Sequence, residues 1–297
     1  MCASSLLLLA GCADASPASD ADLTVAAAFY ALEYVAAEVG GEHVDVIALA
    51  SPGVEPHDLE LSPNAVRKIA GADLVLYLEG FQPAIDDAVA NTEARTFDAA
   101  TAVTLRPADA DEHEGEDHHQ DDGHDHGDND PHFWLDTELL ATYGAALAEE
   151  FAELDPAHAQ TYTANAQRLE AELDALDKEF EAGLAQCARD YVVTSHEAFG
   201  YLTSRYHLTQ VGITGIDPET EPSPARLLEI RELVRSSGAT TIFTESLVNP
   251  AVAEAIARDT GAVTAVLDPV ESVTGDDDYP AVMERNLAAL REGLGCE

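Results

Sequence analysis

The sequence predicts an α/β protein with two lobes, each with a mostly parallel sheet flanked by helices, joined by one long rigid α-helix. Apolar runs alternate with helical patterns in both halves of the chain, and this alternation implies parallel strands with helices on both faces. A long amphipathic stretch separates the halves. The length of 297 residues suits two domains of about 120–150 residues each.

The N-terminal lobe is expected over residues 22–154. Apolar runs at 23–29, 44–49 and 74–78 are typical of buried parallel strands. The intervening segments 30–39, 62–70 and 81–90 have helical patterns. Ser62 followed by Pro63 favours a helix start, because serine caps the helix and proline tolerates its first position.

The connecting helix is expected over residues 155–186, with Asp155-Pro156 as its cap. Apolar residues then recur at spacings of three and four from Tyr162 to Leu184, which forms one buried stripe. About 30 helical residues would span ~45 Å. A coiled-coil dimer is the rival interpretation of the same stripe.

The C-terminal lobe, residues 187–297, repeats the alternation. Strands are expected at 191–194, 210–213, 240–244 and 262–267, and helices at 197–206, 224–237, 250–259 and 279–294. Ser223-Pro224 and Asn249-Pro250 are again typical helix starts.

Residues 1–12 have the pattern of an export signal. The segment Leu9-Ala10-Gly11-Cys12 resembles the bacterial lipobox, in which Cys12 carries lipid and anchors the protein to the outer face of the cytoplasmic membrane. A basic segment typical of signal peptides is missing, so the true start codon could lie upstream. Residues 13–21 are expected to be a flexible tether.

Two further cysteines, Cys187 and Cys296, are left for the folded part. An even pair suits a disulfide in an oxidising compartment, and two buried free thiols are the alternative. Apart from the start of the chain, no apolar run approaches the ~20 residues of a membrane-spanning helix.

The net charge is −43, from 14 Lys and Arg against 57 Asp and Glu. A surface this negative excludes nucleic acid as a partner, because phosphate would repel it. Such charge destabilises the compact state unless salt screens it, so we hypothesise a host that lives in high salt. An ordinary acidic exported protein is the alternative.

Residues 109–130 form a low-complexity segment rich in His and Asp. It contains five of the 11 histidines, namely His113, His118, His119, His124 and His126. The segment cannot form a packed core, and its composition favours auxiliary metal binding. A merely solvating acidic loop is the alternative, although it would not explain the histidines.

Four residues outside this segment predict a metal site. His57, His132, His196 and Asp268 lie far apart in sequence, but His196 and Asp268 directly follow predicted strands and two residues come from each lobe. Ligands of parallel sheets bind beyond the carboxyl ends of strands. Three imidazoles and one carboxylate suit Zn²⁺.

The phrases GVEPHDLELSP, DPHFWLD, VVTSHEAFGYL and AVLDPVE resemble the zinc- and manganese-binding lipoproteins of bacterial ABC importers, the cluster A-I solute-binding proteins, of which the zinc-uptake group is the most similar. This resemblance implies a monomer with a metal buried between two lobes, delivered to an ABC permease and its ATPase. Manganese members usually have Glu where this chain has His196, so the resemblance favours Zn²⁺, with Mn²⁺ as the alternative. Glu55 and Glu245 are possible replacements for Asp268.

Other function classes fit the sequence less well. A secreted zinc hydrolase would need a motif such as HExxH, but Gly200 stands where the second histidine would be. No GxSxG motif is present either. The chain is therefore expected not to be an enzyme, and a surface adhesin is the third class considered.

Overall fold

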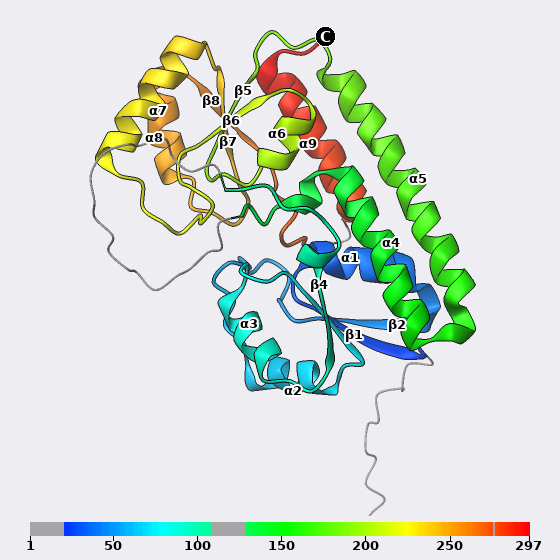
Figure 1. Ribbon diagram of the computed structural model, residues 1–297. Helices are drawn as coiled ribbons and strands as arrows, with labels where there is room; N and C mark the ends of the chain where they lie inside the picture. Colours follow the sequence, from blue (N-terminus) through cyan, green and yellow to red (C-terminus); the bar gives the residue numbers. More distant parts are fainter. Residues whose placement is uncertain (1–20, 109–128, 276) are drawn as a thin grey trace, which may run out of the picture.

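The computed structural model describes residues 21–108, 129–275 and 277–297. These residues form two lobes, each built on a four-stranded parallel sheet. The strand order is β2-β1-β3-β4 in the N-terminal lobe and β6-β5-β7-β8 in the C-terminal lobe. Every pair of neighbouring strands is parallel. Helices pack around both sheets, and the predicted fold class is confirmed (Figure 1).

The strands are short and close to their predicted positions. Their bounds are β1 Leu23–Ala27, β2 Val44–Ala48, β3 Leu74–Tyr77, β4 Arg95–Asp98, β5 Tyr191–Thr194, β6 Thr209–Gly212, β7 Thr241–Thr244 and β8 Val263–Val266. The edge strand β4 was not predicted, because its sequence Arg-Thr-Phe-Asp has no apolar run. The central strands β1 and β3 are almost wholly buried, as their mostly apolar sequences predict.

The helices connect these strands and cover the sheets. Their bounds are α1 Tyr30–Gly40, α2 Pro63–Gly71, α3 Pro83–Ala90, α4 Thr137–Leu154, α5 Ala159–Leu184, α6 Gly200–Arg205, α7 Pro224–Ser237, α8 Ala251–Thr260 and α9 Tyr279–Leu294. The described part of the chain also forms four 3₁₀ turns: η1 Gly41–His43, η2 Ala99–Thr101, η3 Phe133–Leu135 and η4 Pro156–His158. The side chains of Ser62 and Ser223 accept the capping hydrogen bonds of α2 and α7, as predicted.

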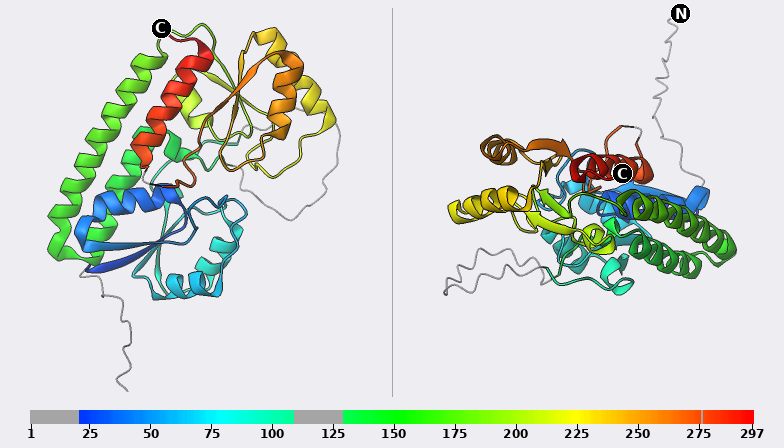
Figure 2. Two further views of the ribbon diagram at one scale, coloured as in Figure 1. Left: turned by 180° about the vertical axis from the view of Figure 1, so that it is seen from behind. Right: turned by 90° about the horizontal axis from the view of Figure 1, so that it is seen from above.

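The long helix α5 is shorter than predicted. Asp155 caps the 3₁₀ turn η4, and the α-helix begins only at Ala159 and ends at Leu184. Its 26 residues span about 39 Å. The predicted stripe from Tyr162 to Leu184 is buried, but against helices of the same chain: α5 packs on α4, α1 and α9, and it runs along both lobes (Figures 1 and 2). The coiled-coil interpretation of this stripe is therefore wrong.

One hydrophobic core extends through both lobes and the helices that join them. It includes buried residues of β1 and β3, of α4 and α5, and of β5 and α9. A second, smaller core lies between the C-terminal sheet and helices α7 and α8. Because a close-packed core resists deformation, we expect the lobes to tilt only slightly relative to each other.

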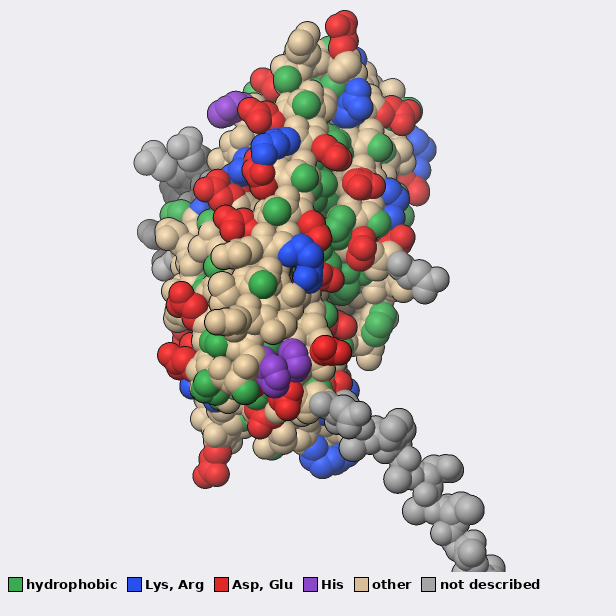
Figure 3. Space-filling model, turned by 90° about the vertical axis from the view of Figure 1, so that its right-hand side faces the viewer, with side chains coloured by type: hydrophobic (Ala, Val, Ile, Leu, Met, Phe, Trp, Pro, Cys, Tyr) green, Lys and Arg blue, Asp and Glu red, His purple; other side chains and the backbone are tan. Residues whose placement is uncertain are grey.

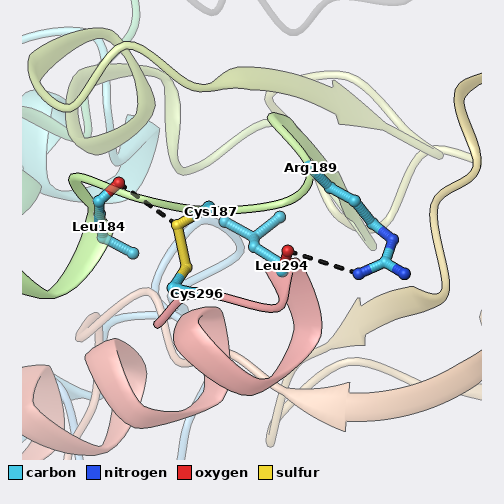
Figure 4. The surroundings of a disulfide bond; sticks show 5 residues. All are labelled: Leu184, Cys187, Arg189, Leu294 and Cys296. Atoms are coloured by element: carbon cyan, nitrogen blue, oxygen red, sulfur yellow. Dashed lines mark hydrogen bonds between the residues drawn. A yellow bond between two sulfur atoms is a disulfide. The ribbon is translucent and has the colours of Figure 1, made fainter.

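A disulfide joins Cys187 and Cys296, as predicted. It connects the segment after α5 to the segment after α9 (Figure 4). Arg189 reinforces the junction by donating a hydrogen bond to the carbonyl of Leu294 at 3.4 Å. Within the described residues, no helix is long and apolar enough to cross a bilayer.

Candidate metal centre

Four buried side chains converge between the lobes. His57, His132, His196 and Glu271 each offer one ligand atom, and these atoms all lie within 4.8 Å of one another. The three imidazoles are at most 2% exposed and Glu271 is 4% exposed. Two of the residues belong to the N-terminal lobe and two to the C-terminal lobe, so the site is complete only when the lobes are together.

A single carboxylate oxygen faces all three imidazoles. Oε1 of Glu271 lies 3.4 Å from Nε2 of His57, 3.0 Å from Nε2 of His132 and 3.6 Å from Nε2 of His196. In a tetrahedral zinc site with bonds of ~2.0–2.1 Å, neighbouring ligand atoms are ~3.3 Å apart. The observed separations therefore match those of ligands that share one ion.

Loops beyond the carboxyl ends of strands hold these side chains. His57 lies between β2 and α2, His196 two residues after β5, and Glu271 between β8 and α9. His132 immediately precedes η3. The strand order reverses between β1 and β3 and between β5 and β7, where ligands of open α/β sheets bind.

Two carboxylates orient the rings of His132 and His196. Nδ1 of His132 lies 2.8 Å from Oδ1 of Asp130, which also accepts the backbone N–H of His132 at 3.0 Å. Nδ1 of His196 lies 2.6 Å from Oε2 of Glu245, whose other oxygen accepts the backbone N–H of His196 at 3.2 Å. Such partners fix the tautomer so that Nε2 faces the ion.

The predicted carboxylate ligand, Asp268, is not part of the converging group, in which Glu271 takes the fourth place. Oδ1 of Asp268 instead accepts the backbone N–H of Val270 at 2.8 Å, and Val270 has a left-handed φ of 57°. The side chain of Asn286 on α9 accepts the backbone N–H of Asp268 and donates to the carbonyl of Asp268. The resulting turn directs Glu271 toward the histidines, so Asp268 positions the carboxylate that we predicted it to supply.

The two alternative ligands have other positions. Glu245 lies against Nδ1 of His196, on the side of the ring away from Glu271, and it is outside the converging group. Glu55 also lies outside it, and one of its oxygens accepts the N–H of Asp58 at 3.3 Å. Neither carboxylate replaces Glu271.

The electrostatics favour a cation. Burial tends to raise the pKa of Glu271, but hydrogen bonds from the three histidines hold it well below its usual range. Burial tends to lower the pKa of His196, yet Glu245 and Glu271 raise it to about 10. Burial also tends to lower the pKa of His132, but Asp130 and Glu271 raise it above its usual value. Without a metal, protons therefore supply the positive charge that these carboxylates attract.

The donor set fits Zn²⁺. Nε2 of His196 is buried and faces Oε1 of Glu271 at 3.6 Å, a separation that leaves room for an ion between the two atoms. Three nitrogens and one oxygen fill a tetrahedral shell, whereas catalytic zinc sites leave one position to water or substrate. The arrangement can hold an ion but offers no open position for a reaction.

Contacts between the lobes enclose the site. Nε1 of Trp134 donates to the carbonyl of Pro269 at 2.8 Å, and the hydroxyl of Tyr279 donates to the carbonyl of Trp134 at 2.6 Å. On another side, Arg106 donates to the carbonyl of Gly200. A side chain at Gly200 would come within 2.8 Å of Asp130 and 2.9 Å of Arg106, so this close approach requires glycine.

Three predictions fall on segments outside the described residues. They concern the lipobox Cys12, the tether 13–21 apart from Ala21, and the auxiliary histidines of the 109–130 segment. Only the last two residues of that segment, Asn129 and Asp130, are described.

The chain is similar to known metal-uptake proteins over most of its length. A sequence model of the family described as "Zinc-uptake complex component A periplasmic" matches residues 25–293. The zinc-binding lipoprotein AdcA of Streptococcus pneumoniae is 34% identical over 96% of this chain, which spans only 58% of that relative's length. The high-affinity zinc uptake system protein ZnuA of Bacillus subtilis is 30% identical, with 98% of this chain and 95% of the relative covered.

Solved structures of metal-binding proteins are also similar to this chain over most of its length. The laminin-binding protein Lmb of Streptococcus agalactiae, described as bifunctional with adhesin and metal-transporting activity, has a TM-score of 0.81 at 32% identity, covering 92% of this chain and 99% of the other. The Zn(II)-bound ZnuA-like domain of Streptococcus pneumoniae AdcA has a TM-score of 0.75 at 30% identity, covering 92% and 99%.

Proposed function

This chain belongs to the family of zinc-uptake complex component A proteins, and we propose that it captures Zn²⁺ outside the cytoplasm and delivers it to an ABC-type membrane permease. The family consists of binding components for metal uptake rather than enzymes. Zn²⁺ is the cargo in this proposal, held by His57, His132, His196 and Glu271.

The convergence of four buried ligand atoms from two lobes carries the proposal. A closed shell suits tight capture, because no position is left for water or for a substrate. Three imidazole nitrogens favour Zn²⁺ over Mn²⁺, which prefers oxygen ligands. His196 is decisive here, since a carboxylate at this position would shift the donor set toward manganese.

Release follows from the division of the ligands between the lobes. His57 and His132 move with the N-terminal lobe, and His196 and Glu271 move with the C-terminal lobe. Zinc bonds are short, so even a small tilt or loop displacement would separate the two pairs of ligands. We propose that contact with the permease supplies this displacement.

We further propose that the protein is exported and anchored to the outer face of the cytoplasmic membrane through lipid on Cys12, with residues 13–21 as the tether. The lipoprotein name of the pneumococcal relative supports this anchor. The histidines of the 109–130 segment would collect zinc weakly close to His132. We expect the protein to act as a monomer with a permease and an ATPase as its partners.

Competition titration of Zn²⁺ and Mn²⁺ tests the proposal. The parent protein should bind one zinc ion tightly and prefer it strongly over manganese. His57→Ala, His132→Ala and His196→Ala should each weaken zinc binding sharply, whereas His207→Asn, a change at an exposed histidine outside the site, should not. Manganese preference, or parental zinc affinity in any of the three alanine variants, would contradict the proposal.

A further inference from the structure

A second group of side chains with the chemistry of metal ligands lies at the surface, where the N-terminal lobe meets the turn before α5. Asp22, His43 and His158 each offer one ligand atom, and these atoms lie within 4.8 Å of one another. Asp22 precedes β1, His43 precedes β2, and His158 ends η4. This surface site is therefore at the amino ends of the strands. It lies opposite to the cleft site, which consists of His57, His132, His196 and Glu271 between the lobes, beyond the carboxyl ends of the strands.

The three side chains share a compact geometry. Oδ2 of Asp22 lies 3.1 Å from Nδ1 of His43 and 3.6 Å from Nδ1 of His158. These distances bracket the ~3.3 Å between neighbouring ligands of a tetrahedral zinc ion. The two rings are stacked, with 3.7 Å between centroids and 16° between planes, and a pair of histidine side chains is visible together on the surface in Figure 3.

Neighbouring groups hold the surface site in place. Nδ1 of His158 also lies 2.6 Å from Oδ2 of Asp155, and the hydroxyl of Tyr162 donates to the same oxygen at 2.8 Å. His43 packs edge-on against the ring of Tyr162. The rings are thus ordered by the start of α5, while the side chains of Asp22, His43 and His158 are 48%, 20% and 33% exposed, so an ion from solvent can reach them.

We propose that Asp22, His43 and His158 form a second binding site for a divalent transition-metal ion. Two imidazole nitrogens and one carboxylate oxygen suit Zn²⁺ rather than Ca²⁺ or Mg²⁺, which take oxygen ligands. Water completes the shell, because only three protein ligands are present. Each imidazole binds through Nδ1, the nitrogen that faces Asp22, and keeps a proton on Nε2. His158 therefore exchanges its contact with Asp155 for the bond to the ion.

Occupation of the surface site would link three segments that are distant in sequence. The ion would join the residue before β1 to the start of β2 and to the start of α5. Because metal binding to the folded state alone stabilises it, zinc would stabilise the end of the lobe at which the chain enters the fold. The surface site has fewer ligands than the cleft site and greater exposure, so it fills after the cleft site.

Proton–nitrogen NMR of the histidine rings tests this proposal on the full chain. One equivalent of Zn²⁺ first fills the cleft site, and further Zn²⁺ is then added. The ring signals of His43 and His158, assigned with His43→Asn and His158→Asn, should shift together along one saturable curve. The ring of His207, an exposed histidine outside both sites, should not follow that curve.

Asp22→Asn provides the second arm of the experiment. Asparagine keeps the size of the side chain but removes the anionic ligand, so the dissociation constant from the same titration should rise several-fold. Ring signals that do not move with added zinc would overturn the proposal. Signals that move identically in the parent and in Asp22→Asn would also overturn it, because the carboxylate would then not be a ligand.

Discussion

Exchanging Glu271 for glutamine tests which carboxylate is the fourth ligand of the cleft site. The structure indicates Glu271, whereas the sequence predicts Asp268. Glu271→Gln keeps the shape of the side chain but removes the charge that faces three Nε2 atoms at 3.0–3.6 Å. Removing one partner from a buried charged pair costs about 3–5 kcal/mol. At ~1.4 kcal/mol per tenfold change, this corresponds to a loss of zinc affinity of roughly a hundred- to several-thousand-fold.

The lower end of this range is expected at neutral pH. Burial alone would lower the pKa of His132 and His196, but Glu271 and the orienting carboxylates raise both values. Loss of Glu271 therefore also weakens the proton competition at these rings and offsets part of the lost affinity. Competition with a chromophoric chelator at several pH values would measure both effects.

Asp268→Asn is the matched control for this experiment. The amide oxygen of asparagine can still accept the N–H of Val270, which Asp268 accepts at 2.8 Å, so the turn and Glu271 should stay in place. Zinc affinity should then remain close to that of the parent. If Asp268→Asn lost as much affinity as Glu271→Gln, or if Glu271→Gln bound zinc like the parent, the assignment of Glu271 as the fourth ligand would be refuted.

Four further predictions follow from the same structure. Zinc binding should release protons near neutral pH and strengthen as pH rises, because zinc needs neutral imidazoles and the pKa of His196 is raised to about 10. Calorimetry in buffers of different ionisation enthalpy would measure the proton release, and identical heats in all buffers would contradict it. Asp130→Ala and Glu245→Ala should each weaken zinc binding about 10–100-fold without removing a ligand, since they only orient the rings; unchanged affinity in the chelator assay would show that orientation contributes nothing. Replacing both Cys187 and Cys296 with serine should lower the free energy of unfolding by about 4–5 kcal/mol in the chain-entropy account, measured by denaturant titration, while zinc affinity stays unchanged. Deleting 111–129 should reduce the total zinc bound but spare the tight site, and loss of the tight site in calorimetry would contradict that division.

Much of the fold could be predicted because burial leaves a clear pattern in the sequence. The central strands β1 and β3 are apolar apart from Thr24, and the seven buried positions of α5 recur at helical spacing. The edge strand β4 has no such run. The start of α5 was misplaced because Asp155-Pro156 begins a 3₁₀ turn, which has the same cap-and-proline pattern as an α-helix.

The cleft site could be predicted in part. His57, His132 and His196 follow strands or precede a turn, and the structure brings them together. The fourth group was expected to be Asp268, the first polar residue after a strand, whereas Glu271 is the carboxylate in the converging group. The signal for Glu271 was present in the phrase AVLDPVE, but the left-handed conformation of Val270, which redirects the chain, cannot be deduced from residue order alone.

A crystal structure of the zinc-loaded protein, with anomalous scattering recorded at the zinc absorption edge, would show which side chains hold the ion. We expect a strong anomalous peak between the lobes, bonded to Nε2 of His57, His132 and His196 and to the carboxylate of Glu271 at ~2.0–2.2 Å. A zinc ion bound without these three histidines, or one bound to Asp268 instead of Glu271, would contradict this expectation.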